Sequence, residues 1–271
     1  MLLRFTLTPH PSRRLYVQSH VRECRQMRFS LIHPSRNRVA LAEQALVEWT
    51  GKASGRHDCE YILSIDDDDG DIEGYRRIAA RRHVELVIDR NRSLVDAVNR
   101  GATLARGDVL IVVSDDFGCP EQWDIALAEV IGERRDVAVL VSDQGDARIM
   151  TLPIVGRILY QEIGWLYHPE YFSMFADDDL TATVSVRNRL IDARHLVFPH
   201  RHYALGGNRF DATYARQNSS AAWRAGRRVF QKRRRAQFGL RSWSVRLQLE
   251  YWIVDVGYFA NLFGGRWLKR Q

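Results

Sequence analysis

Two adjacent carboxylates, Asp115 and Asp116, follow a short apolar run over residues 109–113. A β-branched run bounded by turn formers is typical of a buried strand in a parallel sheet. Ligands of open α/β sheets bind at the carboxyl ends of the strands. Adjacent aspartates repel each other, and a cation beside them relieves that repulsion. The pattern indicates a Mg²⁺ or Mn²⁺ site bridging a substrate diphosphate; the alternative is that both residues only cap the next turn or helix.

A run of four aspartates, Asp66 to Asp69, follows a second strand-like segment at residues 60–65. An aspartate at a strand end can accept a hydrogen bond from a nucleobase N–H or a ribose hydroxyl. The run lacks the alternating ligands and the distal glutamate of an EF-hand loop, so a calcium loop is excluded. It is either a solvated turn or part of an acidic pocket.

The segments around these acids alternate between strands and helices, which predicts an α/β fold. We expect strands at residues 28–33, 60–65, 84–88, 109–113 and 136–141, and helices at residues 39–50, 72–82, 94–105 and 120–131. The loop that follows the first strand is where a nucleotide would lie. In that loop Arg36 and Arg38 are candidates for contacts with phosphate or base, although arginines in surface loops are usually only solvated.

The composition of the 271-residue chain favours an anionic partner, because its formal net charge is +7. The alternative is the ordinary basicity of an arginine-rich proteome. Its cysteines, Cys24, Cys59 and Cys119, fit neither a zinc site nor a disulfide framework, which indicates a reducing compartment. No apolar run reaches the length of a membrane span, and the first one is too short for a signal peptide. We therefore expect a cytoplasmic protein, free or peripheral to a membrane.

Three motifs follow one another in residues 28–130: PSRNR at residues 34–38, SIDDDDGD at residues 64–71 and NRSLVDAVNRGATLARGDVLIVVSDDF at residues 91–117. Their order resembles the nucleotide-binding half of inverting family 2 glycosyltransferases of the GT-A fold, and the resemblance extends more loosely to about residue 215. Two positions depart from the family pattern. Ser114 stands where the first aspartate of a DXD motif is usual, and Arg92 stands where a glycine usually follows Asn91.

The resemblance implies a GT-A fold, which is a Rossmann-like, mostly parallel sheet flanked by helices, and a nucleotide-diphosphate sugar donor, with a UDP-sugar favoured. It implies that Asp116, which matches the last aspartate of DXD, binds Mn²⁺ or Mg²⁺, with Asp115 second. Many enzymes of this fold complete the metal site with a later histidine, and we rank His200 above His202. The donor-binding candidates are Pro34, Arg36, Asn37, Arg38, Asp66, Asp67, Asn91, Asn99 and Asp115.

A second acidic cluster, Asp177 to Asp179, supplies the candidate catalytic residue. In the family an aspartate at the start of an acceptor-side helix is the catalytic base, and Asp177 takes that position. Inverting transfer is a single in-line displacement, so the attacking hydroxyl must lose its proton as it reacts. The alternative is a helix N-cap with additional charge.

The rest of the chain is aromatic and then basic. Residues 165–175 hold five aromatic side chains, which we interpret as core for the most part and otherwise as an acceptor platform. Seven cations fall between Arg224 and Arg235, which fits a phosphate backbone, anionic lipid headgroups or a solvated helix face. Residues 245–267 read as an amphipathic helix. We divide the chain into an extension at residues 1–26, a GT-A-like domain at residues 27–215 and a helical C-terminal extension at residues 216–271.

Together these patterns predict a metal-dependent inverting glycosyltransferase that acts on a hydroxyl of a polyanionic acceptor. A glycan on a phospholipid carrier and a hydroxylated base in DNA both meet that description. Two alternatives remain open. One is a nucleotidyltransferase of the same fold, and the other is a nucleic-acid-binding protein with a degenerate sugar-nucleotide site, suggested by Ser114 and the basic tail.

Overall fold

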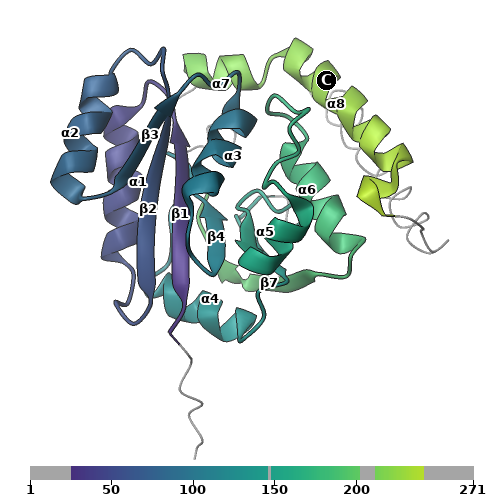
Figure 1. The fold of residues 1–271 in the computed structure, drawn as a ribbon, viewed down its shortest axis with the longest axis horizontal. Helices are drawn as coiled ribbons and strands as arrows, with labels where there is room; N and C mark the ends of the chain where they lie inside the picture. Colours follow the sequence, from purple (N-terminus) through teal and green to yellow (C-terminus); the bar gives the residue numbers. More distant parts are fainter. Residues whose placement is uncertain (1–25, 146–147, 202–210, 241–271) are drawn as a thin grey trace, which may run out of the picture.

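A seven-stranded sheet with helices on both faces forms the computed structural model, which describes residues 26–145, 148–201 and 211–240 (Figure 1). The strands are β1 (Arg28–Ser35), β2 (Asp58–Asp66), β3 (Glu85–Asp89), β4 (Val109–Val112), β5 (Ala138–Ser142), β6 (Ile154–Gly156) and β7 (Leu190–Val197). The helices are α1 (Val39–Gly51), α2 (Ile72–Arg82), α3 (Leu94–Leu104), α4 (Trp123–Ile131), α5 (Arg157–Ile163), α6 (Ala176–Ser185), α7 (Ala212–Gln217), α8 (Ser220–Arg235) and the short 3₁₀ helix η2 (Gln237–Gly239).

The strand order is β3-β2-β1-β4-β6-β5-β7. The strands β3, β2, β1 and β4 pair in parallel, as do β5 and β7, whereas β6 runs antiparallel to both of its neighbours. The chain order strand, helix, strand in the first half confirms the predicted α/β class. Parallel strands place their carboxyl ends at one edge of the sheet, and α7 crosses that edge above β1 (Figure 1).

The element boundaries differ from the predicted ones mainly at strand ends. The first two strands continue two residues and one residue further than expected, to Ser35 and Asp66. Pro34 is tolerated inside β1 because β4 pairs with β1 only as far as Ile32, so its missing N–H removes no bond to that neighbour. The helix expected at residues 120–131 begins at Trp123, because Gln122 before it has a left-handed backbone.

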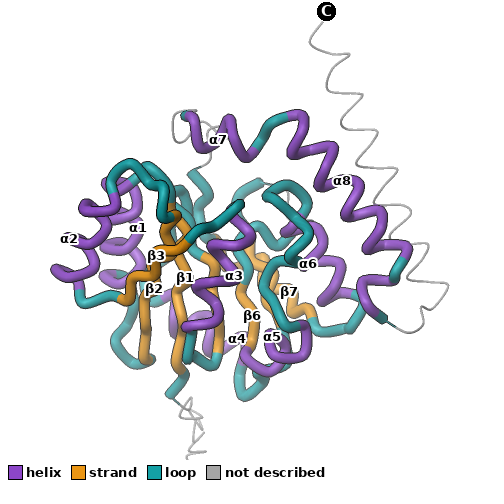
Figure 2. The backbone as a smooth tube through the Cα atoms, turned by 45° about the horizontal axis from the view of Figure 1, so that its top comes forward, coloured by secondary structure: helices purple, strands orange, loops and turns teal. Residues whose placement is uncertain are grey.

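Two hydrophobic clusters lie on opposite faces of the sheet, because successive strand residues point to opposite sides. On β1, Leu31 belongs to the cluster under α1, α2 and α4, and Ile32 belongs to the cluster under α3, α5 and α6. Figure 2 shows the strands between these two helical layers. The core is therefore a three-layer arrangement, with the sheet in the middle.

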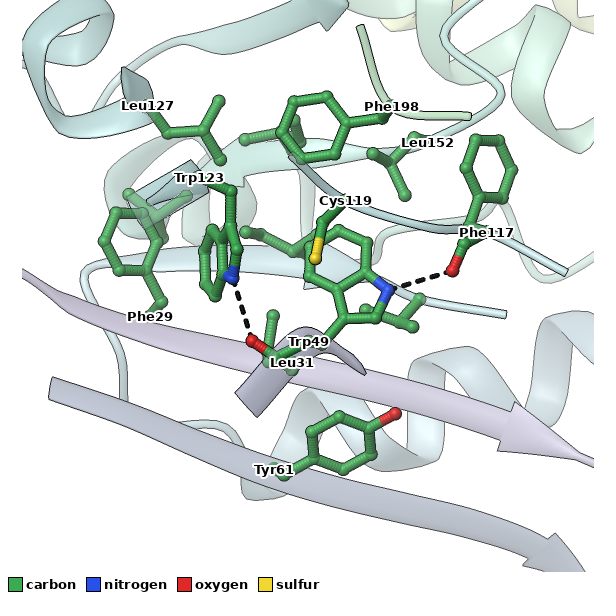
Figure 3. Packing of buried hydrophobic residues seen from close by; sticks show 14 of the residues in the cluster. Phe29, Leu31, Trp49, Tyr61, Phe117, Cys119, Trp123, Leu127, Leu152 and Phe198 are labelled. Atoms are coloured by element: carbon green, nitrogen blue, oxygen red, sulfur yellow. Dashed lines mark hydrogen bonds between the residues drawn. The ribbon is translucent and has the colours of Figure 1, made fainter. Parts of the chain in front are cut away.

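Two tryptophans connect the hydrophobic cluster under α1, α2 and α4 to the segment that follows β4 (Figure 3). Trp123 donates a hydrogen bond from Nε1 to the carbonyl of Trp49 at 2.9 Å, and Trp49 Nε1 donates to the carbonyl of Phe117 at 3.0 Å. Both indoles are fully buried. Because Phe117 directly follows Asp116, this packing fixes the backbone that carries the paired carboxylates.

Three expectations concern residues outside the described part of the chain: the extension at residues 1–26 (apart from Gln26), His202, and the amphipathic segment at residues 245–267. The predicted division at residue 215 falls inside α7. Among the described helices, none combines the length and the apolar character needed to cross a bilayer.

Candidate active site

A pocket opens at the carboxyl edge of the sheet, between the ends of β1, β2 and β4, the segment before α6, and α7. Many of the sequence-predicted site residues line it, namely Pro34, Arg36, Arg38, Asp66, Asp115, Asp116, Asp177 and His200. The other predicted residues in the described chain lie outside its lining, namely Asn37, Asp67, Asn91 and Asn99. Residues from four separate motifs therefore meet in one cavity.

Asp116 is buried and receives polar contacts on both carboxylate oxygens. The Ser114 hydroxyl donates to Oδ1, the Tyr214 hydroxyl donates to Oδ2 at 2.7 Å, and His200 Nε2 lies 3.4 Å from Oδ2. Burial alone would raise the pKa of Asp116. The interactions of its carboxylate with His200 and with the hydroxyls of Ser114 and Tyr214 outweigh burial and hold that pKa well below its ordinary value. Asp116 is therefore a carboxylate at any physiological pH.

His200 lies between two acids. Its Nδ1 is 3.8 Å from Oδ2 of Asp143, and its ring stacks on Phe117 with the centroids 4.1 Å apart. Burial lowers the pKa of His200, but the contacts with Asp116 and Asp143 outweigh it and raise the pKa to about 9. Asp143 is buried and also accepts from the Thr151 hydroxyl at 2.7 Å. No motif in the sequence analysis included Asp143, so its position beside His200 was missed.

The described residues hold no set of three or more His, Cys, Asp or Glu side chains placed around one metal position. Asp116 and His200 form a two-residue set whose nearest atoms, Oδ2 and Nε2, are 3.4 Å apart. Two neighbouring ligands about 2.1 Å from one divalent ion lie roughly 3 Å from each other, so the spacing of the pair allows a shared ion once His200 has released its proton. Mg²⁺ commonly takes one or two protein ligands and completes its shell with phosphates and water.

Asp115 points away from this pair. Its Oδ1 accepts from the Ser35 hydroxyl at 2.8 Å and lies 3.0 Å from His33 Nε2, and its Oδ2 is 3.6 Å from Arg38 Nη1. His33 is in turn 2.7 Å from the Tyr61 hydroxyl. These contacts tie the end of β4 to β1, so the geometry favours Asp116 with His200 over Asp115 as a metal set.

The end of β2 is an acidic corner of the pocket. Arg36 Nη1 donates to Asp66 Oδ2 at 2.5 Å and also bridges to Asp68, and Arg216 Nη1 lies 3.6 Å from the same oxygen of Asp66. Asp66 is buried, whereas Asp67 is exposed. Of the two aspartates predicted to contact the base, Asp66 lines the pocket and Asp67 does not.

The predicted asparagines hold loops in place. Asn91 donates to Asp66 Oδ1 at 3.1 Å, and Asn37 accepts from the N–H of Gly70 at 3.0 Å. Asn99 accepts from the N–H of Tyr167 at 3.1 Å and donates to its carbonyl at 2.6 Å. Tyr167 itself lines the pocket. The asparagines therefore shape the pocket from behind its walls.

Asp177 faces the pocket from the first turn of α6 and is half-buried. The N-cap of this helix is Phe175, in a left-handed backbone and without a side-chain cap bond, so the capping alternative does not describe Asp177. Burial raises the pKa of Asp177, and the negative charge of Asp143 adds to that shift. A carboxylate of raised basicity at the pocket wall is suited to accept a proton.

Asp179, two residues further on, belongs to the core. It accepts from the Tyr171 hydroxyl at 3.0 Å and forms an ion pair with Arg233 of α8, also at 3.0 Å. The aromatic segment before α6 is mostly core, as expected, because Tyr167, Tyr171 and Phe175 are buried. The acidic cluster thus divides into one aspartate toward the pocket and one toward the protein interior.

Helix α7 supplies site residues that the sequence analysis missed. Besides the bond from Tyr214 to Asp116, Thr213 donates to the carbonyl of Arg36 at 3.2 Å. Arg38 forms a two-pronged bond with Asp211, from Nε at 2.7 Å and from Nη2 at 2.6 Å, and its guanidinium lies 4.1 Å from the Tyr214 ring centre. The one feature of the local sequence that could have indicated this helix is Asp211, a residue type that favours the N-cap position. In the structure Asp211 caps α7 by accepting a hydrogen bond from the N–H of Tyr214.

No protein-family model matches this sequence, and no curated protein matches it significantly. Solved structures do resemble it. The mannosyltransferase PcManGT from Pyrobaculum calidifontis, solved with GDP-Man and Mn²⁺, has a TM-score of 0.51 at 16% identity over 88% of this chain and 81% of its own. TarS from S. aureus has a TM-score of 0.52 at 15% identity over 64% of this chain, which spans only 36% of TarS.

A shorter TarS structure, residues 1–349 with UDP-GlcNAc, gives a TM-score of 0.50 at 16% identity, covering 64% of this chain and 57% of that one. At such identities the likeness concerns the fold. It confirms the predicted GT-A-like architecture, with a mostly parallel sheet between helices and further helices at the C-terminal end of the described chain.

Proposed function

We propose that this chain is a metal-dependent inverting glycosyltransferase that moves a sugar from a nucleoside-diphosphate donor, a UDP-sugar being favoured, to a hydroxyl. The observation that carries the proposal is the meeting of Asp116, His200 and Asp177 in one pocket at the carboxyl edge of a GT-A-like sheet. This combination offers a cation-binding pair and a separate proton acceptor. Such a pair of functions is what an in-line sugar transfer requires.

We propose one orientation for the donor in the pocket. We place its nucleoside against Asp66 and the loop after β1, because that corner offers a buried carboxylate next to Pro34 and Arg36. We place its diphosphate beside Asp116 and His200. A divalent ion held by Asp116 and His200 would neutralise charge that develops on the departing diphosphate. Arg38 lines the same wall, where its guanidinium is paired with Asp211.

Asp177 then acts on the acceptor. The acceptor oxygen forms a bond to the anomeric carbon while the bond from that carbon to the donor phosphate breaks. The hydroxyl proton passes to the Asp177 carboxylate, and the electron pair of the broken bond leaves with the nucleoside diphosphate. Attack from the side opposite the leaving group inverts the anomeric configuration. The raised pKa of Asp177 makes it a stronger proton acceptor than an ordinary aspartate.

The acceptor we propose is polyanionic, or is carried by a polyanion. The net charge of +7 and the basic helix α8 support this class. The chain enters α8 directly after Gln217 and Asn218, which line the pocket. An acceptor that leaves the pocket on this side would meet that helix first.

A thermal-shift screen tests the proposal. The full chain is heated with UDP-, GDP- and TDP-sugars, each with Mn²⁺ and with EDTA. A ligand that binds only the native state raises the unfolding midpoint, and we expect one donor to do so more strongly with Mn²⁺. The Asp116→Asn variant should lose that metal-dependent part. A screen in which no nucleotide sugar shifts the midpoint would contradict the proposal.

The product separates sugar transfer from nucleotidyl transfer on the same fold. Sugar transfer releases a nucleoside diphosphate, whereas nucleotidyl transfer releases pyrophosphate. Incubating the preferred donor with the protein and separating the products by ion-exchange chromatography shows which bond breaks. Pyrophosphate as the product would replace the proposal with the nucleotidyltransferase.

A further inference from the structure

Helix α8 is fixed against the segment that carries the candidate base. A Cβ atom on Gly226 would lie only 2.2 Å from the carbonyl oxygen of Met174, so the helix packs directly on that backbone. Trp223 meets the Phe175 ring edge-on, with the centroids 4.8 Å apart. Figures 1 and 2 both show α8 running along the flank of the molecule beside α6. The apolar side of α8 is therefore occupied by the protein itself.

Among the seven cations between Arg224 and Arg235, both Lys232 and Arg233 form ion pairs with the domain. Arg233 has only 12% of its side chain exposed and bonds to Asp179, and Lys232 bonds to Glu170 at 2.7 Å. The sequence analysis had grouped these residues with the others, as a surface for a phosphate backbone or anionic lipid headgroups or as a solvated helix face. For Arg233 that grouping is wrong, because its guanidinium is turned inward to a buried carboxylate.

Three other arginines form a stripe on the solvent side. Arg224, Arg228 and Arg235 are all exposed, and their spacing of four and seven residues places them on one face of the helix. None of the three has an ion pair with an acid in the described part of the chain. Like charges four residues apart destabilise a helix slightly, so helix stability does not account for the stripe.

The composition of the exposed face of α8 indicates which class of partner it can bind. A helix that binds a membrane surface inserts an apolar face into the lipid, but the apolar face of α8 packs on the domain. The large apolar side chains exposed in the described chain are Val47, Ile158 and Val197, and none of them is on α8. What remains is a row of guanidinium groups, which suits repeated phosphates.

We infer that the exposed arginine stripe of α8 binds the sugar–phosphate backbone of a nucleic acid. The stripe is about 16 Å long at 1.5 Å per residue. A duplex carries one phosphate per about 1.7 Å of its axis, so on the order of ten phosphates pass along that length. The inference rests on the proposed function in one respect: it takes the nucleic acid to be the polyanion that was proposed as the acceptor or its carrier.

Fluorescence anisotropy with the full chain tests the inference. Labelled duplex DNA, single-stranded DNA and RNA of mixed sequence are titrated over a range of KCl concentrations. The variant Arg224→Gln/Arg228→Gln/Arg235→Gln removes the stripe. The matched control Arg76→Gln/Arg77→Gln/Arg82→Gln removes the same charge from α2, which lies at the opposite end of the molecule (Figure 1). Unfolding midpoints of all variants confirm that each one folds.

On duplex DNA, the slope of log affinity against log salt concentration should be smaller in magnitude by about 2.7 for the stripe variant than for the wild type. This value corresponds to about 0.9 for each of the three lost phosphate contacts. The control variant should keep the wild-type slope. Equal losses in both variants would mean that general basicity causes the binding and would overturn the inference. Absence of nucleic-acid binding at low salt would also overturn the inference. The same holds if the protein binds no nucleic acid but floats with phosphatidylserine vesicles in a manner that depends on the stripe.

Donor binding distinguishes failure of this inference from failure of the proposed function. The thermal shift given by the preferred nucleotide sugar should be the same in the stripe variant and in the wild type. If nucleic acid binds through the stripe while no nucleotide sugar binds at all, the inference stands and the proposed function fails. If a nucleotide sugar binds but the stripe variant keeps the full salt slope, the inference alone fails.

Discussion

The hydroxyl of Tyr214 donates a hydrogen bond of 2.7 Å to Oδ2 of Asp116, although the two residues are 98 positions apart in the chain. This bond joins α7 to the end of β4. It ends on the same carboxylate oxygen that faces His200 Nε2. In the proposed mechanism that oxygen faces the cation, so a bound cation and the Tyr214 hydroxyl compete for it.

Replacing Tyr214 with Phe should therefore have two effects. The loss of a hydrogen bond to a charged, buried group should lower the free energy of unfolding by about 2 kcal/mol, measured in urea. Mn²⁺ should bind more tightly, measured by the loss of the free-ion electron paramagnetic resonance signal. The control is Tyr160→Phe, whose hydroxyl has no hydrogen bond within the described chain. Weaker Mn²⁺ binding in the Tyr214 variant would show that the hydroxyl supports the cation instead of competing with it.

Two neighbouring residues of α8 should differ sharply in their effect on stability. Arg233→Met leaves the buried Asp179 carboxylate without its cation, which should cost about 3 kcal/mol. Lys232→Met breaks an exposed pair with Glu170 and should change stability by less than about 1 kcal/mol. Urea unfolding of both variants measures the difference. Similar small losses would mean that the pair with Asp179 does not hold α8 on the domain.

Transfer should depend on pH through Asp177. Its pKa is raised, and only its carboxylate form accepts a proton, so the rate should fall as the pH drops through this pKa and level off above it. Asp143→Asn removes a nearby negative charge and should move the acidic limb of the kcat/KM profile to lower pH. Asp192→Asn, at an exposed position of β7, should leave the limb in place. An acidic limb that does not respond to residue 143 would point to another titrating group.

Metal and donor should bind cooperatively, because the Asp116–His200 pair and the diphosphate are proposed to share one cation. Isothermal titration with the preferred donor should give weaker binding in EDTA than with Mn²⁺. The Asp116→Asn variant should bind the donor with similar, weak affinity in both buffers. Equal affinity of the wild type with and without metal would remove the cation from the mechanism.

Much of the fold follows from local patterns, which explains where prediction succeeded. Helix α2 begins and ends at the predicted residues, because Asp71 caps its start by accepting from Gly74 and the chain turns left-handed at His83. Asp66 and Asp116 could be recognised because each lies at or just beyond the end of a strand: Asp66 is the last residue of β2, and Asp116 comes shortly after β4. Such signals need only a few neighbouring residues.

Contacts between distant residues could not be predicted in this way. Nothing near Tyr214 indicates that its hydroxyl reaches Asp116, because α7 has only six residues and no strong period. Arg233 and Arg228 look alike in sequence, and only the position of Asp179, 54 residues before Arg233, makes one of them internal. The asparagines of the family pattern likewise gave no sign that they act on loops from behind the pocket.

The Asp177→Asn variant tests the central claim most directly, because it removes the proposed proton acceptor and keeps the size of the side chain. Donor affinity and the rate of nucleoside diphosphate release with acceptor present are measured for this variant and, as a control, for Asp192→Asn at an exposed position of β7. We predict unchanged donor affinity and a rate at least about 100-fold lower for Asp177→Asn, with the control close to wild type. A variant that binds donor and transfers sugar at near the wild-type rate would contradict the account.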